Sequence, residues 1–485
     1  MMLCKKLWSD RFSNLPDDVA HHILSFLGVR DLASVGAVSK RCREFYLSVP
    51  SVNIDASCYL HAVPLVNLDA SCYLKTSSKL GALMCFWDRY MFQRGVNKMQ
   101  RFYINWTFFT RGIANKDSVE QYRINSWIHN AVRCNVEELN LNFTACGGFT
   151  FVLPSCLYQS QSFKSLVLNL KCLDEMTLEA PPVSLSCNLR YLQLTSVRIA
   201  DEKFCKWISS SCKCIKELQL IQVKGIKNIT IQSSSLESFT FVGMDLVDLN
   251  ISGQKLRSIE IKWNFYSSPG YCSLNISAPN LEDLTWAGKV LNSQNLGKLL
   301  NLKRAFIALE PTVDDNLSEV FSSICRTKDL GINENTMKAM FKDCFMQAPL
   351  DDIRRLGLQL PSFSNDIVPI TASLLRRTGY LNSLVLMSSK PSRSDSKSIS
   401  SSGFDMGYWK LQNLTFVYQL EDLRIDLSSG SNEIEFAKYI LENAPNLKKI
   451  VIRHHPGSQQ SNIVVGKVTR CKIISRAIIV IQEIR

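Results

Sequence analysis

The chain has 485 residues, 46% of them hydrophobic, so it can bury a sizeable core in several domains or in one long repeat array. Its formal net charge is +13, but lysine and arginine are interleaved with acidic residues, and the densest basic cluster is only Lys40, Arg41 and Arg43. A dispersed basic excess is typical of a solvated surface, which makes direct nucleic-acid binding the less favoured function.

The 17 cysteines are scattered along the chain, and residues 1–10 contain no apolar stretch of signal-peptide length. No apolar run approaches the ~20 residues that a membrane-spanning helix needs. We therefore expect an intracellular protein, nuclear or cytoplasmic, that has reduced thiols and makes no membrane contact.

Residues 15–46 carry dense helix signals. Pro16 can stand in the first turn of a helix, and Asp17 places negative charge at the positive end of the helix dipole. Gly28 is expected to end this helix and Asp31 to cap the next one. Such short helices are not stable alone, so part of their core could come from a partner. Apolar residues recur every three or four positions through both segments: Val19, Ile23, Phe26, Leu27, Leu32, Val35, Val38, Cys42 and Phe45.

This stretch resembles an F-box, in the form found in large plant families of F-box and leucine-rich-repeat proteins. Gly28 stands where a proline is common in the family, and Cys42 where a tryptophan is common. The residues that carry the resemblance are Leu15-Pro16-Asp17, Ile23-Leu24-Ser25-Phe26-Leu27, Asp31 and Ser39-Lys40-Arg41.

The resemblance implies that this segment binds a Skp1-type adaptor, which joins a cullin scaffold carrying the ubiquitin-transfer machinery. The alternative is a helical cap without a partner. The residues expected to divide their apolar surface between the domain's own core and the adaptor are Leu15, Pro16, Ile23, Leu24, Phe26, Leu27, Leu32 and Val35.

Between the F-box-like stretch and residue 130 lie two unusual segments. The 14-residue unit VNIDASCYLHAVPL at 52 is followed at 66 by the near copy VNLDASCYLKTSSK, which we interpret as a local duplication accommodated in a loop. The stretch 85–106 is rich in aromatic residues and arginine. It is compatible with a nucleic-acid patch, but we favour an N-terminal cap that covers the open apolar end of a repeat array.

From residue 136 one six-residue template recurs. Its first, fourth and sixth residues are apolar, and its other three residues are variable. VEELNL at 136, LRYLQL at 189 and LRSIEI at 256 are examples. This is the leucine-rich-repeat signature, and early copies are 26 or 27 residues apart, with helix-like sequence between them.

Copies only 10 or 11 residues apart between 215 and 256 cannot each close a full coil, so we assign alternate copies to two ladders on opposite sides of the coil. The predicted fold is an α/β repeat solenoid, in which the small helical F-box precedes a curved leucine-rich-repeat array.

The apolar template positions should point into the core and the variable ones outward, as a surface of mixed polarity that suits a protein partner better than an apolar ligand. As candidate substrate-binding residues we select Tyr191, Gln193, Glu217, Gln219 and Glu260.

Two later segments differ from the array. Residues 388–403 are rich in serine and predict a flexible loop. The stretch LENAPNLKKIVIRHHPG and the later SRAIIVIQEIR resemble the terminal FBD-type segment of the plant family. The predicted domains are the F-box at 9–50, a linker and cap at 51–130, leucine-rich repeats at 131–409, and terminal repeats with an FBD-like segment at 410–485.

We find no pattern typical of catalysis or metal binding. Cys212 and Cys214 form a C-x-C without a second pair at zinc spacing, and there is no phosphate-binding glycine motif. We therefore expect no cofactor, no catalytic residue and no metal site. The favoured function is the substrate-recognition subunit of an SCF-type (Skp1–cullin–F-box) E3 ubiquitin ligase, which binds a protein substrate. The alternatives are a repeat scaffold without ligase recruitment and a nucleic-acid-binding repeat protein.

Overall fold

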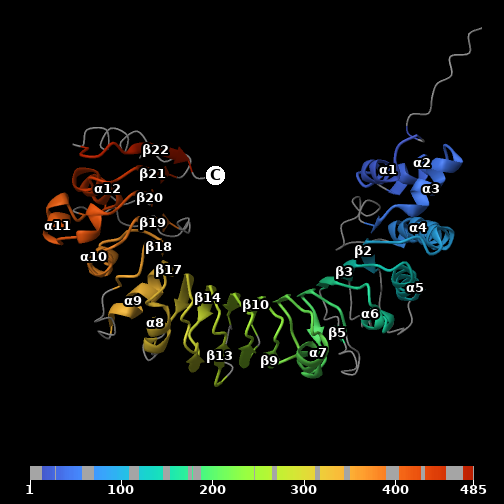
Figure 1. Cartoon of the computed structure of the whole chain (residues 1–485), viewed down its shortest axis with the longest axis horizontal. Coiled ribbons are helices and arrows are strands. Elements are labelled where there is room, and N and C mark those ends of the chain that lie inside the picture. Colours follow the sequence, from blue (N-terminus) through green and yellow to red (C-terminus); the bar gives the residue numbers. More distant parts are fainter. Residues whose placement is uncertain are drawn as a thin grey trace, which may run out of the picture. The chain divides into compact units, whose positions relative to one another are not determined.

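Strands of a parallel ladder alternate with helices or second strands along most of the chain in the computed structural model (Figure 1). The chain forms two units, Met1–Asp245 and Leu246–Arg485. Gly28, residues 57–69 of the tandem duplication and nearly all of the serine-rich segment lie outside the described residues. The loop predicted for the duplication is wrong where the structure describes it, because residues 52–55 lie in a strand and residues 70–79 in a helix. The first helix ends at Leu24, before the predicted end at Gly28. The structure describes residues 12, 14–27, 29–56, 70–108, 119–145, 153–172, 177–178, 187–244, 246–264, 270–311, 317–342, 350–388, 403–427, 432–454 and 473–483.

Three short helices open the first unit. The first follows Pro16, as its sequence predicts, and the Ser39 side chain caps the third by accepting a hydrogen bond from the Cys42 backbone N–H at 3.1 Å. Asp31 lies in the first turn of the second helix rather than before it, so the cap expected there is wrong. The helices are α1 (Asp17–Leu24), α2 (Val29–Gly36) and α3 (Lys40–Ser48).

A small closed core holds these helices together. Ala20 and Leu24 of α1 pack against Phe45 of α3 and Val49, and all four are almost completely buried. Phe12, Leu15, Leu27, Leu32 and Val35 are partly buried against this core.

A buried arginine joins the three helices to the rest of the first unit. Arg94, at the end of α4 (Ala70–Arg94), donates hydrogen bonds to the Val49 carbonyl at 2.7 Å, the Lys98 carbonyl at 2.8 Å and the Tyr90 hydroxyl at 3.0 Å. Tyr90 in turn donates to the Tyr46 carbonyl of α3. Directly after α3 the chain enters the parallel ladder, because the first strand, β1 (Ser51–Asp55), begins three residues after Ser48.

The ladder of the first unit contains seven described strands, each parallel to the next. Alternate residues are buried, because one face packs on the core and the other, which we call the open face, lies opposite the helices (Figure 1). In order of pairing they are β1 (Ser51–Asp55), β2 (Arg101–Phe108), β3 (Glu138–Ala145), β4 (Ser165–Cys172), β6 (Tyr191–Thr195), β8 (Glu217–Ile221) and β10 (Ser238–Gly243).

The side opposite the open face is closed first by helices and then by strands. Trp127 of α5 packs edge-on against Trp106 of β2, and Trp207 of α7 packs against Tyr158 of α6. These elements are α5 (Val119–Arg133), α6 (Cys156–Gln159), α7 (Lys203–Ser211), the short pair β5 (Thr177–Leu178) and β7 (Arg198–Ile199), and β9 (Asn228–Gln232).

The second unit repeats this plan with nine described strands in its ladder, again all parallel. In order of pairing they are β12 (Ser258–Trp263), β14 (Asp283–Lys289), β16 (Arg304–Glu310), β17 (Asp329–Asn333), β18 (Arg355–Leu360), β19 (Ser383–Ser388), β20 (Asp422–Asp426), β21 (Lys449–His454) and β22 (Ile478–Glu483).

Behind this second ladder the order is reversed, because strands come first and helices later (Figure 1). The strands β11, β13 and β15 pair in parallel as part of a second sheet. These elements are β11 (Asp248–Ser252), β13 (Ser273–Ser277), β15 (Ser293–Asn295), α8 (Ser318–Ile324), α9 (Glu334–Lys342), α10 (Ile367–Arg377), α11 (Met406–Leu411), the 3₁₀ turn η2 (Thr415–Tyr418) and α12 (Asn432–Asn443).

The predicted fold class, an α/β repeat solenoid behind a small helical domain, is confirmed. The closely spaced copies form the two separate sets of strands that their spacing predicts. Three ladder strands were missed as repeats. β1 and β2 lie in the segment that we assigned to the linker and cap, and in β17 the first apolar template position is occupied by the buried Thr327.

Candidate functional site

The exposed face of α1 carries an apolar stripe. Val19 and Ile23 keep 45% and 41% of their surface exposed, and Phe26, one turn further, keeps 75%. Val38, between α2 and α3, is 74% exposed. Apolar side chains left in water add no stability to a small domain. The stripe therefore has the properties of an interaction surface.

The eight residues predicted to face an adaptor fall into three groups. Leu24 lies wholly in the core, whereas Pro16, Ile23 and Phe26 are exposed. The remaining four, which are half-buried against the core, are Leu15, Leu27, Leu32 and Val35. The structure therefore places half of the set at the boundary between core and surface.

Charged and polar groups fix α3 against α1 beside this stripe. Arg41 forms ion pairs with Asp17 of α1 and with Glu44, and its guanidinium lies 4.2 Å from the centre of the Phe45 ring. His21 Nε2 lies 2.9 Å from the Ser48 hydroxyl oxygen. Burial lowers the pKa of His21, and the nearby Asp17 carboxylate opposes that effect.

Four of the five predicted substrate residues lie together on the open face of the first unit. Tyr191 and Gln193 of β6 stand directly beside Glu217 and Gln219 of β8. The Tyr191 hydroxyl donates to Gln193 Oε1 at 2.7 Å, and Gln219 Nε2 donates to Glu217 Oε1 at 2.6 Å. Partial burial raises the pKa of Tyr191. These neighbours hold one another's orientation, which forms an ordered polar surface.

Glu260, the fifth predicted residue, is on β12 of the second unit. Its carboxylate pairs with Lys262 at 2.7 Å, and 38% of its side chain is exposed. It also faces outward, because its neighbours Ile259 and Ile261 are buried.

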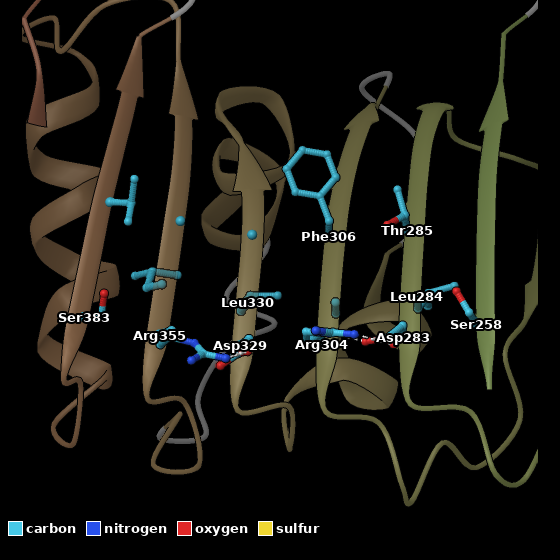
Figure 2. A pocket seen from close by; sticks show the side chains of 15 residues that line it. Ser258, Asp283, Leu284, Thr285, Arg304, Phe306, Asp329, Leu330, Arg355 and Ser383 are labelled. Atoms are coloured by element: carbon cyan, nitrogen blue, oxygen red, sulfur yellow. Dashed lines mark hydrogen bonds and ion pairs between the residues drawn. The ribbon is translucent and has the colours of Figure 1, made fainter. Parts of the chain in front are cut away.

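A hollow of about 480 Å³ lies on the open face of the second unit (Figure 2). It runs across five strands, from β12 to β18, and reaches β19. The residues that line it are Ser258, Asp283, Leu284, Thr285, Arg304, Ala305, Phe306, Asp329, Leu330, Gly331, Arg355, Leu356, Gly357, Ser383 and Val385.

One side of this groove is a row of alternating charges at the first residue of successive strands. Asp283, Arg304, Asp329 and Arg355 are consecutive partners in the ladder. Arg304 Nη2 donates to Asp283 Oδ2 at 2.7 Å, and a second contact joins Nε to Oδ1. Arg355 donates to Asp329 through Nη2, and these bonds raise the pKa of both arginines. Figure 2 shows the two pairs side by side.

The floor of the groove lies one outward position further along the strands. There Thr285, Phe306, Gly331, Gly357 and Val385 are consecutive partners. The Phe306 ring covers Gly331, since a Cβ at that glycine would lie 2.6 Å from ring carbon Cδ2. Gly357, by contrast, is uncovered, because a Cβ there would meet only ordinary contacts at 3.8 Å or more.

None of these groove residues is among the candidate residues predicted from the sequence. The template position just before the second apolar residue is Asp283, Arg304, Asp329 and Arg355 in four successive strands. Alignment of the copies would have revealed this alternation of sign, had the copy containing Asp329 been recognised. The position of the Phe306 ring over Gly331 has no comparable pattern in the sequence.

Within the described residues, no three His, Cys, Asp or Glu side chains come together as a metal site would require, and no helix is long and apolar enough to cross a membrane. Cys212 of the C-x-C is buried and Cys214 is exposed, both as free thiols.

Comparison with known proteins gives the same two-part division. An F-box-like family profile matches residues 12–48, and the profile described as At1g61320/AtMIF1, LRR (leucine-rich-repeat) domain, matches residues 104–483. The chain is similar to the Arabidopsis thaliana F-box/FBD/LRR-repeat protein At4g03220, with 24% identity over 477 residues that cover 92% of this chain and 89% of the relative. It is also similar to the F-box/LRR-repeat protein At4g14096 of the same plant, with 22% identity over 482 residues that cover 93% and 89%.

Proposed function

The chain belongs to the plant family of F-box proteins with leucine-rich repeats, and from that premise we propose that it is the substrate-recognition subunit of an SCF-type (Skp1–cullin–F-box) E3 ubiquitin ligase. The F-box binds a Skp1-type adaptor and, through it, a cullin scaffold. The open face of the repeats binds a protein substrate.

The observation that carries this proposal is the exposed stripe of α1 beside a closed core. Ala20 and Leu24 complete that core, whereas Ile23 and Phe26 keep 41% and 75% of their surface exposed, and the Phe26 ring meets the His22 ring edge-on at 5.0 Å. The stripe lies within the segment that matches the F-box-like profile. An adaptor that covers it would remove the apolar surface of these residues from water.

The chain acts without catalysis of its own in this proposal. It contributes proximity, because it holds a substrate lysine near the charged carrier that the cullin scaffold brings. It works inside the cell, in the nucleus or the cytoplasm, and requires no cofactor. The proposed domains are 9–50 for the F-box, 51–130 for the linker and cap, 131–409 for the repeats and 410–485 for the terminal repeats.

The test is capture of a purified Skp1-type adaptor by the full chain. Ile23→Asp puts an unpaired charge on the stripe, which is costly to bury, and should reduce capture at least about tenfold. Val96→Asp is the matched control, because Val96 is 72% exposed outside the F-box, and it should leave capture unchanged. A folded wild-type chain that captures no adaptor would refute the ligase proposal.

Affinity purification with identification of the recovered proteins separates the alternatives. Recovery of adaptor and cullin supports the ligase subunit. Recovery of other proteins without these two supports a scaffold of leucine-rich repeats. Recovery that disappears after nuclease treatment supports nucleic-acid binding.

A further inference from the structure

We propose that the groove on the second unit binds an extended segment of a protein substrate that carries an aromatic side chain two residues from a carboxylate. In this proposal the ligand's aromatic ring lies on Gly357 beside Phe306, and its carboxylate pairs with Arg355. Figure 2 shows where Phe306 and Arg355 lie in the groove. As a statement about substrates, this inference rests on the proposed function, whereas the binding itself can be tested without the adaptor.

The charge that a partner meets at the groove is mainly positive. The side chains of Arg304 and Arg355 are 66% and 65% exposed, whereas those of their partners Asp283 and Asp329 are 30% and 20% exposed. An exposed ion pair in water is weak, so each guanidinium can still bind an incoming carboxylate. Charge complementarity therefore favours an acidic group in the partner.

Arg355 is better placed than Arg304 to bind a carboxylate of the partner. Arg304 has an aspartate as its ladder neighbour on both sides, Asp283 and Asp329, and it bonds Asp283 through two nitrogens. Arg355 has Asp329 on one side but Ser383 on the other, so the alternation of charge ends there. Within the part of the chain that the structure describes, its Nε and Nη1 have no partner. These donors can hold a carboxylate, as guanidinium groups commonly do.

Gly357 is the second feature of the groove that favours a ligand. Glycine inside a strand destabilises the strand relative to alanine, and such a residue often marks a place where a ligand or another backbone approaches closely. Gly331 is required by the Phe306 ring, but no contact of this kind requires Gly357. The absent side chain leaves a flat surface next to Phe306, on which a second ring can stack or meet it edge-on.

The spacing of these two features defines the segment. Gly357 and Arg355 are two residues apart on β18, which is about 6.7 Å along a strand. Side chains at i and i+2 of an extended peptide have the same separation and point to the same side. The groove is formed by one face of a sheet, so it covers a ligand on one side only. This favours a protein segment held by further contacts over an enclosed small molecule.

The test uses the full chain and labelled peptides of the form Ser-Gly-Trp-Gly-Asp-Gly-Ser, with fluorescence anisotropy as the readout. Matched peptides replace Trp by Ala, replace Asp by Asn or Lys, or change the spacing of Trp and Asp to one, three or four residues. We expect the Trp–Asp peptide with a spacing of two to bind best, about tenfold better than the Asn peptide at low salt.

Three variants locate the contacts. Gly357→Leu fills the floor without a backbone clash and should reduce binding about tenfold or more, while the thermal unfolding midpoint stays the same or rises. Arg355→Gln should abolish the preference for Asp over Asn, and Arg304→Gln should largely keep it. If Gly357→Leu leaves binding intact, if the Asp preference survives Arg355→Gln, or if no peptide binds selectively, the inference is wrong.

Two further measurements distinguish peptide binding in the groove from nucleic-acid binding and from failure of the ligase proposal. If a 12-nucleotide RNA binds more tightly than the peptide and loses that binding in Arg355→Gln, the groove is a nucleic-acid site and the inference is overturned. Adaptor capture is scored separately. Selective peptide binding without adaptor capture refutes the ligase proposal but supports peptide binding in the groove. Adaptor capture without selective peptide binding refutes only the proposal that the groove binds a peptide.

Discussion

The Arg453 guanidinium bonds the buried Asp426 carboxylate through two contacts, Nε to Oδ1 at 2.6 Å and Nη2 to Oδ2 at 2.5 Å. They join neighbouring strands β20 and β21, and only 3% of the Asp426 side chain is exposed. This bidentate pair belongs to the same class as Asp283 with Arg304, but the latter is largely in water. Loss of the Asp426–Arg453 pair should therefore lower the free energy of unfolding far more than loss of the Asp283–Arg304 pair.

Arg453→Met should lower the free energy of unfolding of the second unit by about 3–5 kcal/mol, because it leaves a buried carboxylate without its counterion. Arg304→Met, the matched exposed pair, should cost less than about 1 kcal/mol. Urea unfolding of both variants provides the measurement. Asp426→Leu added to Arg453→Met should recover much of the loss. Equal effects of the two single changes would show that burial does not govern the Asp426 pair.

Most of the ladder was predictable because its strands are specified locally. The inward positions must be apolar in every copy, so the template appears in the sequence wherever all three positions are filled. β17 escaped detection because Thr327 occupies the first of them. The spacing of the copies was also sufficient to assign strands such as β11 and β13 to a second sheet.

The candidate sites were less predictable, because they depend on which element packs where. The family resemblance selects Ile23 and Leu24 alike and the helical period selects only Ile23, yet the packing of α1 on α3 buries Leu24 and leaves Ile23 exposed. Likewise, the sequence shows Phe306 and Gly331, but only the three-dimensional register puts the ring over that glycine and leaves Gly357 open.

Arg94 should be essential to the junction between the helical domain and the first repeats. Its side chain is buried and bonds three oxygens, at Val49, Lys98 and Tyr90. Arg94→Met removes these charge-assisted bonds and should destabilise the junction by about 3 kcal/mol. Limited proteolysis of the full chain should then show faster cleavage near residue 49. Arg89→Met, an exposed position of the same helix, is the control. Unaltered cleavage in Arg94→Met would contradict this role.

His21 should make the helical domain sensitive to acid. Burial lowers its pKa in the folded state, with Arg94 and Arg41 acting in the same direction and Asp17 and Asp18 opposing them. Below about pH 6.5, the usual pKa of histidine, the unfolded chain therefore binds the proton more readily. The stabilisation by neutral His21 is present above that pH and is lost as the pH falls toward the folded-state pKa.

The measurement is the difference in unfolding midpoint between wild type and His21→Gln at pH 7.5 and pH 5.5. At pH 5.5 the unfolding midpoint of wild type should be lower, relative to that of the variant, than it is at pH 7.5, because His21 titrates and glutamine does not. A difference that is the same at both values would exclude His21 as the source of any acid sensitivity.

The polar open-face positions should contribute to substrate capture, because inward residues are committed to the core while outward ones form an ordered surface. Tyr191 with Gln193, and Glu217 with Gln219, already hold each other in place, so little side-chain entropy is lost when a partner binds. We expect the combined alanine variant to lose capture at least about tenfold, since a few well-placed residues dominate most interfaces. The variant replaces Tyr191, Gln193, Glu217, Gln219 and Glu260.

Capture would be measured with substrates recovered by the wild-type chain, beside adaptor capture by the same preparations. The control is an alanine set of the same kind on the helix side of the first unit, at Lys203, Lys206 and Ser210 of α7, which are exposed. Adaptor capture should hold in both sets, because the F-box is unchanged. If substrate capture survives the open-face set but falls in Gly357→Leu, recognition depends on the groove of the second unit. Survival in both variants would mean that neither open-face site contributes to substrate recognition.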